Sequence, residues 1–233
     1  IAAFFPRHRG LVVFGLYATG LIVAIICAMI LKKTVLKGGH APFVMELPPY
    51  RLPTLKTLWM HMYDRIKDFV IRAGTILFAA SVAIWFLRSF DSSFHLLSES
   101  EVDRSILSSI GKAIAPVFRP LGFGVWQAAV ALLTGLLAKE TVVGTLTILY
   151  HPATDAAMSQ ILQGIFSPVA ALSFLVFVLL YMPCVAAFSA IRREMNSWKW
   201  AIGTVTFQTV VAWVVAFMVY QFGTLAVNLV HML

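Results

Sequence analysis

Charged residues are scarce in this sequence. Asp, Glu, Lys and Arg together make up 12% of its 233 residues, whereas hydrophobic residues make up 60%. A soluble protein usually carries roughly 25% charged residues. The scarcity excludes an ordinary water-soluble domain, because so few polar groups cannot cover the surface of a chain of this size. A bilayer lets apolar side chains face outward, so the composition predicts a membrane protein.

Cysteine and catalytic motifs are also lacking. Cys27 and Cys184 both lie inside apolar runs, which excludes a disulfide framework and any CxxC or Cys/His zinc spacing. The six histidines form no HxxxH or HxH pattern, and the sequence has no P-loop, GxGxxG fingerprint or Ser/His/Asp arrangement. We therefore expect no enzyme activity, no nucleotide site and no tightly bound cofactor in this chain.

The formal charge of +8 comes from basic residues placed between apolar runs. Cytoplasmic loops of membrane proteins have this pattern, so the charge does not predict a nucleic-acid partner. The chain opens with Ile1 and not with Met, and we expect its natural N-terminus to lie upstream.

Four apolar runs predict membrane-spanning helices, for which about 20 residues are needed. They lie at residues 10–31, 73–88, 169–191 and 200–222. Trp198 and Trp200 precede the last run, where interfacial aromatic residues are expected. The predicted fold class is an all-α polytopic membrane protein with about four spans. It is divided into residues 1–41 (first span and basic flank), 42–72 (cytoplasmic linker and amphipathic helix) and 73–233 (the domain with the remaining spans).

The linker is rich in proline, which excludes helix at residues 46–53. Thr54 can cap a helix that begins at Leu55. From Leu55 to Phe69 apolar residues recur at helical spacing, with charged residues mainly elsewhere around the helix. This pattern predicts an amphipathic helix that lies in the headgroup region and leads into the second span.

Residues 121–150 are apolar except for Lys139 and Glu140, and they contain four glycines. The segment is either one long span or a re-entrant hairpin of two half-helices. Only the hairpin puts the basic segments 32–72 and 192–199 on the same side of the membrane. Positive-inside statistics favour this arrangement, with both segments in the cytoplasm.

Two places could carry chemistry. Lys139 and Glu140 are costly at membrane depth, so they either line a path, with Glu140 as an oxygen ligand for a divalent cation, or form a structural ion pair. In the run Tyr181-Met182-Pro183-Cys184, Pro183 would free the carbonyl four residues earlier, close to the thiol of Cys184 and the thioether of Met182. A borderline cation such as iron(II) can accept thiolate, carboxylate and carbonyl ligands. The alternative is an ordinary proline kink with a buried cysteine that serves packing.

Three stretches resemble the ferrous iron transport protein B family. They are PFVMELPPYRLP at residues 42–53, LAKETVVGTL at residues 137–146, and LLYMPCVA at residues 179–186, which looks like the family's second gate motif. AIRREM at residues 190–195 and SWKWA at residues 197–201 match as well. These landmarks follow the family's order along nearly the whole chain.

The resemblance implies GTP-dependent uptake of Fe²⁺, the transported substrate, across the bacterial inner membrane. It identifies residues 73–233 as similar to the family's gate-type permease domain and places Cys184 on the iron path. Together with the chemistry of the two places above, we predict Cys184 and Glu140 as metal ligands and Lys139, Tyr181, Met182 and Pro183 as residues of the transport path. The expected partners are the lipid bilayer, the upstream GTPase domain and first gate, a small cytoplasmic accessory protein and further copies of the chain. GTP would act only through the upstream domain.

Other functions stay open. Gate motifs of this kind also resemble those of nucleoside carriers, although polar residues for a ribose and a base are few: Gln127, Thr134, Lys139, Glu140 and Thr141. A membrane anchor without transport activity is a further alternative.

Overall fold

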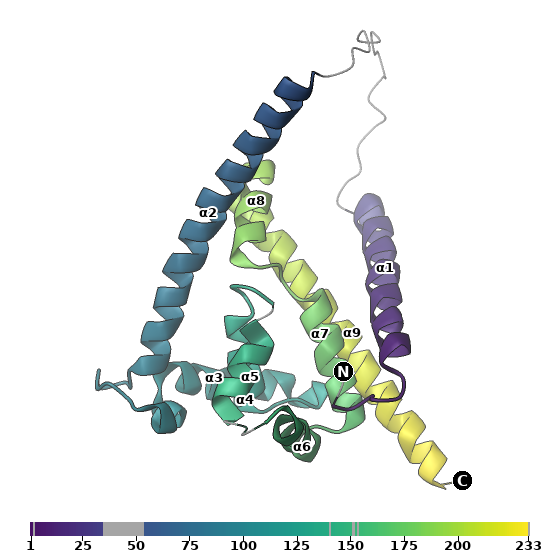
Figure 1. The fold of residues 1–233 in the computed structure, drawn as a ribbon. Helices are drawn as coiled ribbons and strands as arrows, with labels where there is room; N and C mark the ends of the chain where they lie inside the picture. Colours follow the sequence, from purple (N-terminus) through teal and green to yellow (C-terminus); the bar gives the residue numbers. More distant parts are fainter. Residues whose placement is uncertain (2, 35–53, 140, 151, 153, 233) are drawn as a thin grey trace.

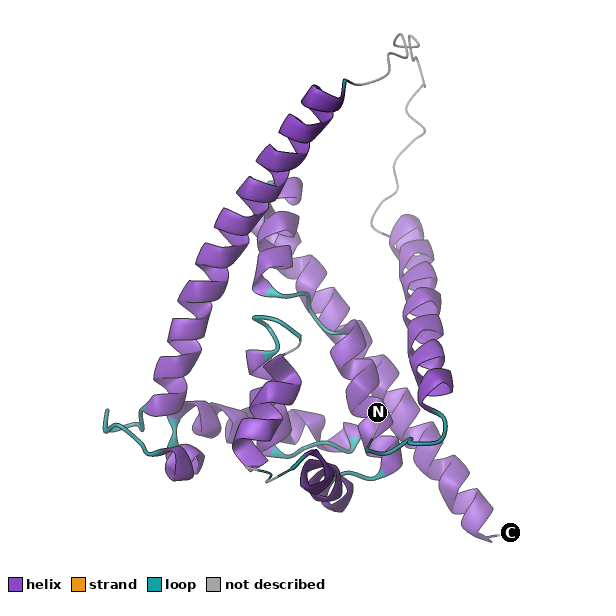
Figure 2. Ribbon diagram, in the orientation of Figure 1, coloured by secondary structure: helices purple, strands orange, loops and turns teal. Residues whose placement is uncertain are grey.

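The fold is helical throughout the part of the chain that the computed structural model describes, namely residues 1, 3–34, 54–139, 141–150, 152 and 154–232 (Figures 1 and 2). Within these ranges the only β features are two isolated bridges. The predicted all-α class is confirmed, whereas the predicted linker at residues 42–53 and Glu140 lie outside the described residues. The elements in order are α1 (Arg9–Thr34), α2 (Leu55–Ser89), η1 (Glu99–Arg104), α3 (Ile106–Phe118), η2 (Arg119–Leu121), α4 (Trp126–Thr134), α5 (Thr141–Tyr150), α6 (Asp155–Ile165), α7 (Pro168–Leu180), α8 (Val185–Met195) and α9 (Trp198–Met232).

Two described helices, α1 and the Trp198–Leu229 part of α9, are long and apolar enough to cross a membrane. Two bent pairs also qualify: Ile106–Leu121 with Trp126–Thr134, bent by 104°, and Ala156–Ile165 with Pro168–Leu180, bent by 101°. Counting each bent pair as one span gives up to four. Helices α1 and α9 match the predicted spans at 10–31 and 200–222, and the second bent pair overlaps part of the predicted span at 169–191, whereas the first bent pair was not predicted as a span. Helix α1 buries none of its residues, and Leu11 is 72% exposed, as expected for a helix that faces lipid.

Helix α2 joins two elements that the sequence analysis separates. Thr54 caps it as predicted, since its hydroxyl accepts a hydrogen bond from the backbone N–H of Thr57. The helix then continues for 35 residues into the predicted span at 73–88. At 1.5 Å per residue it is about 50 Å long, well beyond the hydrocarbon thickness of about 30 Å. The structure thus has one long helix in place of a separate helix along the membrane surface.

The predicted span at residues 169–191 is not continuous. Helix α7 ends at Leu180, α8 begins at Val185, and the two flanking residues Tyr181 and Cys184 have extended backbone. Pro183 has no N–H, and it disfavours helical backbone at the residue before it. The proline therefore produces a full break, which we name the 181–184 break, where a kink was expected.

Residues 126–150 form a helical hairpin, the second of the two predicted alternatives. Helices α4 and α5 have nine and ten residues, so each is about 15 Å long and too short to span a bilayer. The hairpin is held by packing of Ala131 against Val142 and Leu146, and by a 2.7 Å hydrogen bond between the hydroxyls of Thr134 and Thr145. We name residues 135–139 the hairpin tip.

The core lies where α7 and α9 run side by side (Figure 1). The Ser173 hydroxyl on α7 donates a 2.9 Å hydrogen bond to the Ala216 carbonyl on α9, and both residues are buried. The segment after η2 completes the core, because Phe123 is fully buried and packs edge-on against Phe174.

Gly122 allows the chain to turn into this core. Its φ of +85° is left-handed, and a Cβ atom there would overlap the ring of Tyr220 on α9. Gly122→Ala should therefore destabilise the fold by about 1–3 kcal/mol, from backbone strain and overpacking together. Thermal unfolding in detergent micelles measures the effect. Gly203→Ala is the matched control, because a Cβ on Gly203 meets nothing within 4 Å, and its melting temperature should not fall.

Candidate functional site

The 181–184 break and the hairpin tip lie against each other. The backbone N–H of Val185 donates a 2.8 Å hydrogen bond to the carbonyl of Leu136, and the Lys139 ammonium donates a 3.0 Å bond to the carbonyl of Leu179. Figure 1 shows the α4–α5 connection at the level of the α7–α8 connection. Two interruptions far apart in the sequence thus satisfy each other's exposed backbone groups.

Lys139 is a half-buried link in this arrangement. Besides its bond to Leu179, the ammonium lies 5.0 Å from the centre of the Tyr181 ring, a cation–π contact. Leu179 is the residue whose carbonyl Pro183 was expected to free, and that oxygen is occupied by Lys139. Glu140, the other member of the predicted charged pair, lies outside the described residues.

Tyr181 closes the inner side of the site. It is only 3% exposed, and its ring stacks on Phe177 with centroids 5.5 Å apart. Its hydroxyl donates a long hydrogen bond of 3.5 Å to the Leu132 carbonyl on α4. Gly135 permits this approach, because a Cβ atom there would overlap the Tyr181 hydroxyl.

Cys184 occupies the N-cap position of α8, and its thiol is free and partly exposed. The N-terminal end of a helix carries a partial positive charge. The sulfur also lies within electrostatic range of Lys139. Met182 and Pro183 beside it are partly exposed as well, so three of the predicted path residues share this surface.

The described residues contain no group of three or more His, Cys, Asp or Glu side chains close enough to hold a metal ion.

A hydroxyl cluster in the hairpin was only partly anticipated. Thr141 donates hydrogen bonds to the carbonyls of Thr134 and Ala138, at 2.9 and 2.7 Å, and Thr134 pairs with Thr145. The sequence analysis named Thr134 and Thr141 only as sparse polar residues. The four-residue spacing of Thr141 and Thr145, which puts both on one helix face, was the available signal.

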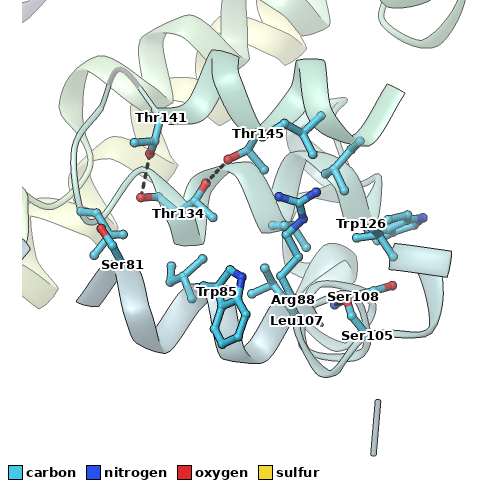
Figure 3. A pocket seen from close by; sticks show the side chains of 16 residues that line it. Ser81, Trp85, Arg88, Ser105, Leu107, Ser108, Trp126, Thr134, Thr141 and Thr145 are labelled. Carbon is cyan, nitrogen blue, oxygen red and sulfur yellow. Dashed lines mark hydrogen bonds between the residues drawn. The ribbon is translucent and has the colours of Figure 1, made fainter. Parts of the chain in front are cut away.

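These threonines line a cavity of about 220 Å³ between α2, α3 and the hairpin (Figure 3). We name it the α2–hairpin cavity. Leu137 of the hairpin tip lines it, while the neighbouring Leu136 holds Val185. The tip thus separates the cavity from the 181–184 break.

Replacing Lys139 should loosen the tip. In Lys139→Met the bond to Leu179 is lost, and a hydrogen bond from a charged donor typically contributes about 1.5–3 kcal/mol. We expect backbone hydrogen exchange in residues 136–139 and at Val185 to become about tenfold faster, measured by mass spectrometry on the intact protein. Lys139→Arg retains a cationic donor and should exchange much less rapidly than the Met variant. Equal rates in wild type and Lys139→Met would contradict the role of this link.

Comparison with known proteins gives matches along nearly the whole chain. Residues 13–65 match the family described as ferrous iron transport protein B C terminus, and residues 70–198 match the Gate family, described as nucleoside recognition. No solved structure matches significantly.

Curated relatives match over most of the chain. "Fe(2+) transporter FeoB" of Staphylococcus aureus (strain MSSA476) is 40% identical over 97% of this chain, and its namesake in Methanocaldococcus jannaschii is 36% identical over 96%. The chain spans 34% of the length of both relatives. A relative in Porphyromonas gingivalis, 36% identical over 96% of this chain and covered over 32% of its own length, is named "Fe(2+) transport protein A/Fe(2+) transporter FeoB fusion protein". The chain belongs to the ferrous iron transport protein B family, of which it contains C-terminal and gate regions.

Proposed function

We propose that this chain is the C-terminal part of a permease that carries Fe²⁺ across the bacterial inner membrane. The names of its relatives, "Fe(2+) transporter", support the substrate. The rest of the protein would supply a GTPase domain and a first gate. The fusion found in Porphyromonas gingivalis supports a small accessory protein as a further partner.

The observation that carries the proposal is the pairing of the two interruptions inside an apolar protein. Broken helices point their ends into the interior, where carbonyl oxygens can replace part of an ion's hydration shell. Helices α4 and α7 end here and α5 and α8 begin here, and the Val185–Leu136 bond holds the two breaks together. Two such breaks cost an apolar bundle backbone hydrogen bonds, whereas an ion path can use the groups that they expose.

Cys184 is the proposed iron ligand at this point. Fe²⁺ accepts thiolate, carboxylate and carbonyl ligands. The N-cap position puts Cys184 at the positive end of the α8 dipole, and the partial exposure of Met182 and Pro183 leaves an approach to its sulfur. A site with one thiolate and a few oxygens binds weakly enough to release the ion again, as conduction demands. Glu140 would add a carboxylate.

Lys139 has a different proposed role. Its positive charge would repel Fe²⁺, but the ammonium is directed to the Leu179 carbonyl and the Tyr181 ring. It neutralises the negative end of α7 and fixes the hairpin tip. We therefore propose Lys139 and Tyr181 as positioning residues beside the path, with Cys184 in contact with the ion.

The orientation in the membrane follows from the basic residues. The C-terminal end of α1, the N-terminal end of α2 and the α8–α9 turn lie toward the same end of the molecule (Figure 1). Lys32 and Lys33 end α1, and Arg192 and Arg193 end α8. Excess lysine and arginine mark the cytoplasmic side, so we assign this end to the cytoplasm, where the GTPase domain would act.

A carrier for nucleosides is the second candidate, favoured by the description of the Gate family and by the threonine cluster of the α2–hairpin cavity. Competition separates the two: unlabelled nucleosides should not reduce uptake of radioactive iron by the intact protein in vesicles. Competition by a nucleoside at concentrations comparable to those of Fe²⁺ would favour this second function.

Cys184→Ala in the intact protein should lower the initial rate of Fe²⁺ uptake at least about tenfold, the effect expected when a metal contact is removed. Radioactive iron uptake into cells or vesicles measures it. Cys27→Ala is the matched control, because Cys27 is a partly exposed thiol on α1, and it should transport like wild type. Wild-type uptake by Cys184→Ala would remove this residue from the mechanism.

A further inference from the structure

The α2–hairpin cavity has one wall that carries a cation. Ser81, Ile84, Trp85 and Arg88 lie at spacings of three, four and seven residues on one face of α2, and all four line the cavity. The other walls come from η1, α3 and the hairpin, and they are mostly apolar, with Leu107, Val130, Leu137, Ile148 and Leu149 among the lining residues. The cavity is thus amphipathic, apolar along its length and cationic at the end of α2.

The cavity opens to the surroundings of the protein. Trp85 and Ile148, which line it from α2 and α5, are 59% and 40% exposed. Because this part of the chain lies in a membrane, a molecule that enters between these two residues comes from the bilayer. An open apolar volume next to lipid is filled by hydrocarbon more favourably than by water.

Arg88 has no carboxylate partner within ion-pairing distance among the described residues. Its half-buried guanidinium extends into the cavity, between Trp126 and Thr145 in the view of Figure 3. Two acidic residues of the adjoining polar segment have other partners: Glu101 pairs with Arg104, and Asp91 accepts hydrogen bonds from the backbone N–H groups of Ser93 and His95. The His95 and Ser93 N–H groups also keep the pKa of Asp91 below its usual range.

A half-buried cation among apolar walls is unfavourable unless an anion neutralises it. A second cation lies close to this wall: the Lys112 ammonium is 5.5 Å from the centre of the ring of Trp126, a lining residue, and it donates a 2.8 Å hydrogen bond to the carbonyl of Asp103. Arg88 also lies in the last turn of α2, immediately before the helix ends at Ser89 and the polar segment after it begins. That position corresponds to the depth of lipid headgroups, where arginine side chains meet phosphates.

We propose that the α2–hairpin cavity binds an anionic phospholipid, with its phosphate on Arg88 and one acyl chain along the apolar walls. The exposed gap between Trp85 and Ile148 admits the chain. Charge favours an anionic headgroup over a zwitterionic one, because Arg88 and Lys112 together attract net negative charge.

The bound lipid would connect α2 to the hairpin. Helix α2 contacts α3 and α8, and the cavity lies between it and the hairpin. An acyl chain in this space would contact Leu137 of the hairpin tip. The preceding residue, Leu136, accepts the hydrogen bond from Val185 at the 181–184 break. Occupation by lipid would therefore support the hairpin tip. The binding itself is independent of the substrate that the protein carries.

Tryptophan quenching tests the site, because Trp85 and Trp126 line it. The intact protein is placed in phosphatidylcholine nanodiscs that contain dibrominated phosphatidylglycerol, dibrominated phosphatidylcholine or dibrominated fatty acid. The quenching that belongs to the cavity is the difference between wild type and the variant in which Trp85 and Trp126 are both changed to Phe. We expect brominated phosphatidylglycerol to quench at about tenfold lower concentration than brominated phosphatidylcholine, the preference that a charged hydrogen bond provides.

Variants identify the groups responsible. Arg88→Gln should abolish the preference for phosphatidylglycerol, whereas Arg88→Lys should keep most of it. Arg104→Gln is the matched control: it changes an exposed arginine that is paired with Glu101, and it should keep the whole preference. Ile148→Phe narrows the opening without changing charge and should reduce quenching by both phospholipids, which tests the site even if Arg88→Gln does not fold.

Several results would overturn the proposal. They are equal quenching by the two phospholipids in wild type, stronger quenching by the fatty acid than by phosphatidylglycerol, and an unchanged preference in Arg88→Gln. The last result would mean that a carboxylate from the rest of the protein neutralises Arg88.

Discussion

Backbone N–H and carbonyl groups inside a bilayer need partners within the protein, because no water is available to take their place. This chain interrupts its apolar helices twice and so creates unpaired groups at membrane depth. The hydrogen bond from Val185 to Leu136 and the bond from Lys139 to Leu179 pair one interruption with the other. The position of the hairpin, and with it the candidate site, depends on this mutual satisfaction.

Packing makes the pairing rigid. The Tyr181 ring stacks on Phe177, and its hydroxyl lies against Gly135, where a Cβ atom would not fit. Helix α7, which carries Phe177, is in turn buried against α9. Close packing of this kind leaves little freedom for the backbone between its anchored ends. Cys184, three residues after Tyr181, is consequently held at the start of α8, where it is partly exposed.

Lys139 and Arg88 are both half-buried cations among apolar residues, where an unpaired charge is unfavourable, and their surroundings differ. Lys139 is neutralised from within, by a carbonyl at the end of α7 and by the face of an aromatic ring. Arg88 finds no such partner among the described residues, and its environment combines hydrocarbon walls with an opening to the bilayer. The difference explains why the first contributes to internal architecture, whereas the second points to a ligand from outside.

Composition and local pattern determined the membrane class, the helical fold, the Thr54 cap and the family. They also predicted a helix distortion at Pro183, which in the structure is a full break. These features depend on short-range chemistry: hydropathy over a window, a missing N–H, a capping hydroxyl. The tertiary structure alone decided that α2 is continuous, that Lys139 occupies the Leu179 carbonyl, and that Arg88 faces a cavity. Apolar sequences carry little information about which faces meet, because almost every face of such a helix can be buried. Contacts between residues forty or more positions apart are therefore set by packing, and only the folded chain shows them.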